Sequence, residues 1–79
     1  MALANQSSVE VELELELELE LDRARGLLDR WRLQPAASAF KALVEETHHP
    51  VRMQARRLLG VTLIRQGRCE KALEVLIVA

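Results

Sequence analysis

The side chains that most often hold metals or attack substrates are few in this chain of 79 residues, and their spacing suits neither task. His48 and His49 are adjacent just before Pro50, and Cys69 is the only cysteine. Adjacent histidines in a turn do not point at one centre, and the chain has neither a CxxC nor an HExxH spacing. No serine or cysteine has a base at a recognisable spacing, and no glycine-rich loop could bind a phosphate. We therefore expect no catalytic residue, no metal and no cofactor, and the sequence indicates a protein that is not an enzyme.

The charged residues are divided unevenly along the chain, although the formal net charge is only −1. Residues 1–22 carry seven acidic and no basic residues, whereas residues 23–79 carry eleven basic and five acidic residues. The bases after Pro50 have no aromatic side chains between them, and the acidic segment would compete with a nucleic acid for them. We interpret them as a solvated helical face and expect no nucleic-acid partner. An acidic segment lying on these bases is a separate hypothesis, in which salt would weaken the contact.

Amino-acid composition indicates what kind of core and which cellular compartment to expect. Apolar residues make up 49% of the chain, but only Trp31 and Phe40 are aromatic, so we expect a mainly aliphatic core. We expect Trp31 to be one of the buried residues. A single cysteine cannot form an internal disulfide, which favours a reducing compartment. The longest uncharged apolar run, residues 75–79, is far shorter than the ~20 residues that cross a bilayer, and no secretory signal pattern opens the chain. The sequence therefore predicts a cytoplasmic protein without a membrane partner.

Residues 9–21 alternate strictly between an apolar residue and glutamate and form the one low-complexity segment of the chain. A β-strand would place all the valines and leucines on one face, so the pattern alone favours a strand. Leucine and glutamate are strong helix formers, however, and glutamate is depleted in strands. Ser7 and Glu10 also have the spacing of a capping box, which marks a helix start. We favour a helix for this segment, with a strand or a disordered segment as the open alternatives.

From Asp22 onward the apolar residues recur at intervals of three and four, which is the period of an amphipathic helix. Proline suits the first turn of a helix, the residue before a proline avoids the helical region, and glycine favours a helix end. These signals predict four helices, at about 22–33, from Pro35 to the 47–50 segment, at about 51–66 with Gly67 as its stop, and from near Cys69 onward.

Four helices joined by short turns predict an all-α fold of antiparallel helical hairpins. The side chains on the expected apolar stripes are Ala24, Leu27, Leu28, Trp31, Ala36, Ala39, Phe40, Leu43, Val44, Met53, Leu58, Leu59, Thr62, Leu63, Ala72, Leu73, Leu76 and Ile77. By composition the chain divides into a polar lead-in (1–8), an acidic Leu/Glu segment (9–21) and a helical domain (22–79).

The second pair of expected helices resembles the tetratricopeptide repeat (TPR) family. The residues that keep the spacing of the family pattern are Leu59, Gly60, Leu63, Gly67, Ala72, Leu76 and Ala79. Leu63 and Leu76 stand where the family has aromatic residues, and Arg56 replaces its opening tryptophan. In this pattern Gly60 lets two helices approach closely, Gly67 permits a left-handed turn, and Ala72 is small where helices cross.

The first helical pair fits the same pattern less well. A shift of 34 residues places Gly26 on Gly60, whereas a shift of 33 places Ala39 on Ala72, so we interpret the first repeat as degenerate. The chain then holds about one and a half repeats. Solenoid repeats cover their apolar faces with neighbouring repeats, and about three are normally needed for stability. The Leu/Glu segment folded back, a second copy or a different protein could cover the apolar C-terminal face, and we favour a second copy or a partner protein.

The first helix of each repeat lines a concave groove in TPR proteins. Together with the exposed side of the fourth helix, the resemblance implies a partner-binding set of Gln54, Arg57, Leu58, Val61, Ile64, Arg65, Leu73 and Ile77. An aliphatic strip flanked by arginines suits an amphipathic helix or an extended peptide with acidic residues at its edge. The leading hypothesis is a small TPR-like adaptor or chaperone that binds and shields a partner polypeptide. It looks like the small TPR-type chaperones of bacterial type III secretion.

Two alternatives from other functional classes stay open. The first is a self-assembling structural protein in which residues 9–21 pair between copies. The second is an acidic regulator whose residues 10–22 occupy a basic site on another protein. In all three hypotheses the partner is a protein, bound in a hetero- or homo-oligomer, and no small-molecule substrate is expected.

Overall fold

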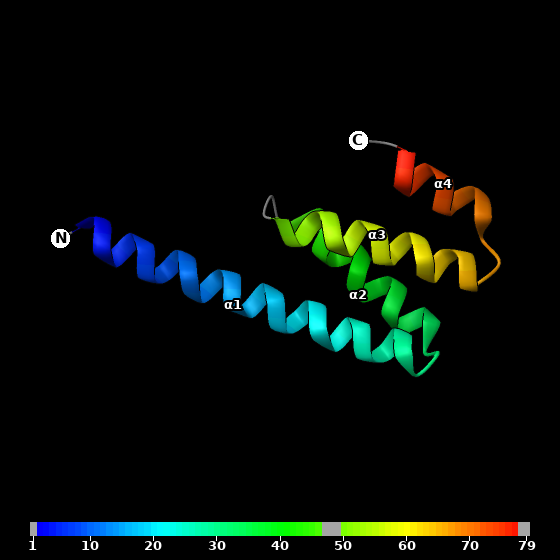
Figure 1. The fold of residues 1–79 in the computed structure, drawn as a ribbon, viewed down its shortest axis with the longest axis horizontal. Helices are drawn as coiled ribbons and strands as arrows, with labels where there is room; N and C mark the ends of the chain where they lie inside the picture. Colours follow the sequence, from blue (N-terminus) through cyan, green and yellow to red (C-terminus); the bar gives the residue numbers. More distant parts are fainter. Residues whose placement is uncertain (1, 47–49, 78–79) are drawn as a thin grey trace.

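The computed structural model describes residues 2–46 and 50–77, and every regular element in those two ranges is a helix. The helices are α1 (Ala2–Asp29), α2 (Leu33–Glu46), α3 (Pro50–Arg65) and α4 (Cys69–Ile77). Successive helices run back and forth, so that α1 with α2 and α3 with α4 form two hairpins (Figure 1). The Cα positions span 51 × 27 × 12 Å, so the stack is long and thin. The predicted all-α fold of helical hairpins is confirmed.

The alternating Leu/Glu segment is helical, and the strand and disordered alternatives are wrong. One continuous helix runs from Ala2 to Asp29, so it begins before the capping box at Ser7 and passes through residues 8 and 21 without a break. The C-terminal half of α1 is anchored because Leu21, Ala24 and Leu28 are buried. Each further residue then adds one backbone hydrogen bond to an existing helix, which is far easier than starting a new element. A strand would have needed a sheet edge to pair with.

The N-terminal half of α1 extends past the other helices (Figure 1). We call residues 9–20 the arm. Its valines and leucines point in several directions around the helix, because a step of two residues advances about 200°. The exposed fractions are 56% for Val9, 52% for Val11, 54% for Leu13, 53% for Leu15 and 57% for Leu19. Only Leu17 among the described apolar side chains of the arm packs against the core.

The hydrophobic core lies where α2 contacts both α1 and α3. Phe40 is fully buried and Leu43 is 2% exposed, and both belong to α2. The buried apolar set is Leu21, Ala24, Leu28, Ala36, Phe40, Leu43, Val51, Ala55, Leu59, Leu63 and Ala72. The expectation that Met53 and Trp31 point into the core is wrong, because Met53 is 67% exposed and Trp31 is 63% exposed. Met53 follows the buried Val51 on α3 by two residues, which places it well away from the buried face of that helix.

Trp31 leaves the core because α1 ends at Asp29, before the end predicted from the apolar stripe. The Trp31 N–H donates to the Leu28 carbonyl at 2.9 Å and the Arg32 N–H donates to the Leu27 carbonyl at 2.9 Å. These two bonds form a Schellman motif, whose turn residue adopts the left-handed region. The φ angle of Trp31 is 59°, a value unusual for a large side chain.

The second hairpin uses the same turn, with a glycine in place of the tryptophan. The Gly67 N–H donates to Ile64, the Arg68 N–H donates to Leu63, and the φ angle of Gly67 is 79°. The left-handed turn predicted at Gly67 is confirmed. Trp31 and Gly67 occupy corresponding places in the two turns and are 36 positions apart. This distance differs from the shifts of 33 and 34 residues by which the sequence alone aligned the two helical pairs, and from the 34-residue TPR period. At 36 positions, buried Ala36 corresponds to buried Ala72.

The close contact between α4 and α3 depends on Gly60, as predicted. A Cβ atom at Gly60 would lie 2.8 Å from two side-chain carbons of Leu76, so a larger residue requires the Leu76 side chain, or α4 with it, to shift. Ala72 is 1% exposed on the same contact. Thr62 on α3 is also fully buried, and its hydroxyl donates to the Leu58 carbonyl at 2.8 Å, which satisfies the polar group within the helix. Among the described helices, α4 contacts α3 alone.

Candidate functional site

Most of the partner-binding residues expected from the sequence lie on the surface. Val61, Ile64, Leu73 and Ile77 are 37%, 51%, 55% and 72% exposed, and we call these four residues the apolar face. The polar members Gln54, Arg57 and Arg65 are also exposed. Leu58 is different, because it is partly buried and packs against the core. The expected set therefore divides into an accessible apolar face with polar edges and one core residue.

The members of the apolar face come to one side of the α3–α4 pair. On α3, Ile64 and Val61 are three positions apart, which places them next to each other on a helix surface. On α4, Leu73 and Ile77 are four positions apart and so lie next to each other on the helix surface. Around the helix they lie on one side of the buried Ala72, and Lys71 and Val75 lie on the other side. Large exposed apolar side chains gathered in this way are typical of a protein-binding surface.

Trp31 and Arg65 form a contact that the sequence did not indicate. The guanidinium carbon of Arg65 lies 4.8 Å from the centre of the Trp31 ring, which is cation–π distance. Arg65 is four positions after Val61 on α3, so the exposed tryptophan lies at one end of the surface that carries the apolar face. Exposed tryptophan and arginine are the side chains most enriched at interface hot spots.

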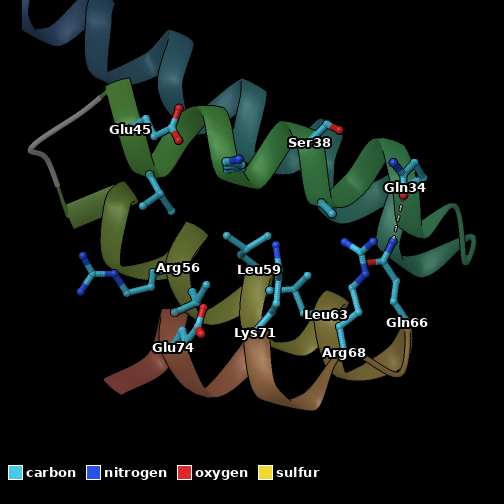
Figure 2. Close-up of a pocket in the computed structure, with 14 residues that line it drawn as sticks. Gln34, Ser38, Glu45, Arg56, Leu59, Leu63, Gln66, Arg68, Lys71 and Glu74 are labelled. Carbon is cyan, nitrogen blue, oxygen red and sulfur yellow. Dashed lines mark hydrogen bonds between the residues drawn. The ribbon is translucent and has the colours of Figure 1, made fainter. Parts of the chain in front are cut away.

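A hollow of about 560 Å³ lies on a different side of the molecule, between α2 and α4 and over α3. Figure 2 shows Leu59 and Leu63 at its floor, Ser38 on the α2 side and Lys71 on the α4 side. The lining residues are Gln34, Ala37, Ser38, Lys41, Val44, Glu45, Arg56, Leu59, Leu63, Gln66, Arg68, Lys71, Glu74 and Val75. None of the eight residues expected from the sequence belongs to this lining.

The hollow combines an apolar floor with a basic rim. Lys41, Arg56, Arg68 and Lys71 contribute four positive charges, and Glu45 and Glu74 contribute two negative charges, so the lining is net positive. Three of these cations, Arg56, Arg68 and Lys71, are among the basic residues after Pro50 that we interpreted from the sequence as a solvated helical face. Periodicity could place them on helix surfaces, but only the packing of α2 opposite α4 shows that they surround one concave space.

A pair of glutamines closes the end of the hollow near the two turns. The Gln66 side-chain Nε2 donates to Gln34 Oε1 at 3.3 Å, and this bond links the start of α2 to the end of α3 (Figure 2). Gln66 Oε1 is buried and, within the described part of the chain, accepts no hydrogen bond.

Metal chemistry and a membrane span find no support in the described residues. No group of three or more histidine, cysteine or acidic side chains in residues 2–46 and 50–77 could hold a metal ion. His48 and His49 lie outside the described residues, and Cys69 is exposed as a free thiol. Among the described helices none is both long and apolar enough to cross a bilayer.

Comparison of the chain with protein-family models, with curated proteins and with solved structures found no match.

Proposed function

We propose that this protein is a small, TPR-like adaptor or chaperone that binds a partner polypeptide and shields its apolar surface. The observation that supports this proposal is the apolar face, because Ile64, Leu73 and Ile77 are all at least half exposed on two adjacent helices. Burial of such side chains contributes about 25 cal/mol per Å² of apolar surface, so leaving them open is a cost that a partner would remove. The proposed role is non-catalytic and cytoplasmic.

The chemistry of the edges favours an amphipathic helix with acidic flanks as the partner segment. Leucine or isoleucine side chains of that helix would cover the apolar face, and its acidic residues would meet Arg57 and Arg65. The Trp31 ring stacked on Arg65 would supply an aromatic anchor at the end of the contact. A subunit of a type III secretion system is the candidate partner that the TPR resemblance implies.

Two structural features support the TPR-like part of the proposal, and one departs from it. Gly60 and Gly67 have the roles that the family pattern gives them, at a close helix approach and a left-handed turn. The 36-residue distance between the two turns is two longer than the TPR period. The partner-binding role rests on the apolar face and does not depend on the family.

The test is to co-purify the partner from the native source and then measure its affinity for purified variants. Replacing Ile64 and Leu73 together by glutamate places two charges in the apolar face, and we expect the dissociation constant to rise at least tenfold. Both side chains are at least half exposed, so the helical content should stay unchanged. The control Ala42→Glu adds a charge at an exposed position of α2 and should bind normally. Equal affinity of the double variant and the control would contradict the proposal.

A further inference from the structure

We propose that the arm of one copy docks into the hollow of a second copy, so that the protein associates with itself through two unlike surfaces. The arm carries six glutamates in residues 9–20 and no base, and the hollow is net positive around an apolar floor. This contact uses neither Ile64 nor Leu73, so it is independent of the partner-binding role. It also explains why a helix with exposed leucines extends beyond the body.

The arm of the same chain does not reach this hollow. The helix α1 is continuous to Asp29, and its C-terminal half packs against α2 and α3. Figure 1 shows α1 and α4 on opposite sides of α2 and α3, with the arm extending away from the body. Bringing residues 9–20 over the hollow would require breaking α1 in a stretch of strong helix formers. The occupant is therefore a second copy.

The sizes and surfaces of the two parts match. At 1.5 Å per residue the twelve residues of the arm extend about 18 Å, and the α2 wall from Gln34 to Glu45 has the same number of residues. The volume of about 560 Å³ accepts several side chains from one side of a helix. Exposed leucines of the arm would contact Leu59, Leu63 and Val75, while neighbouring glutamates reach the basic rim.

Charge favours this contact over pairing of two arms. Two arms side by side would bring glutamates against glutamates, because the acidic residues lie on every side of the helix. In the hollow the same glutamates meet Lys41, Arg56, Arg68 and Lys71. Each copy has one arm and one hollow, so two copies exchange arms as a pair, or successive copies extend as a chain.

A charge-swap experiment tests the proposal on the full-length protein. One variant carries Glu12→Lys, Glu16→Lys, Glu18→Lys and Glu20→Lys, which changes the charge of the arm from −6 to +2. The other carries Lys41→Glu and Lys71→Glu, which changes the charge of the hollow's lining from +2 to −2. All six positions are exposed, and circular dichroism checks that the helical content is retained. Sedimentation equilibrium then measures the mass of each protein in low salt, at about 50 mM, and near 1 M, where charges are screened beyond about 3 Å.

We expect wild-type protein to associate in low salt and to weaken at least tenfold in high salt. Each variant alone should be monomeric, because its arm and hollow carry like charges. An equimolar mixture of the two should associate again, because both arm–hollow contacts in the mixed pair are then complementary. Monomeric wild-type protein, two variants that both still associate, or a mixture that stays monomeric would each overturn the proposal. A variant with Glu12→Gln and Glu16→Gln separates the alternatives, because it should weaken arm–hollow contact but strengthen arm–arm pairing.

Discussion

Replacing Phe40 by alanine is expected to unfold most of the protein at room temperature. Phe40 is fully buried at the centre of α2, in the core that α2 forms with α1 and α3. Truncating a buried phenylalanine costs about 3–5 kcal/mol through lost burial and the cavity left behind. A single core in a chain of this size supplies only about 3–5 kcal/mol of stability. Urea unfolding followed by circular dichroism measures the loss.

The matched controls for this prediction are Phe40→Leu and Trp31→Ala. Phe40→Leu keeps most of the volume and should cost less than about 1.5 kcal/mol. Trp31→Ala truncates the only other aromatic residue, but its ring is 63% exposed, so stability should fall by less than about 1 kcal/mol. If Trp31→Ala destabilised the protein as much as Phe40→Ala, the turn at the end of α1 would be placed wrongly.

Replacing Gly60 by leucine is expected to separate α4 from the rest of the protein. A Cβ atom at this position would lie 2.8 Å from side-chain carbons of Leu76, which would have to turn aside, and we expect the further carbons of leucine to force the two helices apart. Overpacking of this kind costs about 1–3 kcal/mol, and α4 has no other described helix to hold it. Hydrogen exchange should show the amides of α4 losing protection at least tenfold, while those of α2 change little.

Gly26→Leu is the control for Gly60→Leu. Gly26 is also inside a helix, but a Cβ atom there would meet nothing within 4 Å. Replacing a helical glycine in open space should raise stability by about 0.5–1 kcal/mol, because the unfolded chain loses freedom. Equal exchange rates in α4 for the Gly26 and Gly60 variants would contradict the close contact between α3 and α4.

Periodicity and end signals predicted the helical body well. The apolar stripes of residues 35–46 and 51–66 put Phe40, Leu43, Leu59 and Leu63 inward, and all four are buried. Gly67 marked the turn after α3 because a left-handed residue there favours glycine. These features depend on neighbours close in sequence, so the sequence alone indicates them.

Trp31 and the hollow depend on packing that local patterns do not encode. The apolar stripe of α1 continues through Trp31, and nothing local marks Asp29 as the helix end, because the left-handed position holds tryptophan instead of glycine. The hollow needs α2 and α4 to face each other across α3, and its residues come from three helices. The residues of the apolar face were predicted from the TPR resemblance for α3 and from the apolar C-terminal stretch for α4, and their exposure agrees with that prediction.

Binding of the neutral dye Nile red to the isolated protein is the most direct test of the central claim, which is that the helix stack has an open apolar face on α3 and α4. A neutral dye avoids attraction to the basic rim of the hollow. We expect the folded wild-type protein to enhance the dye's fluorescence, and the protein with Ile64→Glu and Leu73→Glu to lose most of that enhancement at unchanged helical content. Full enhancement in the double variant, or none in the folded wild-type protein, would contradict the claim.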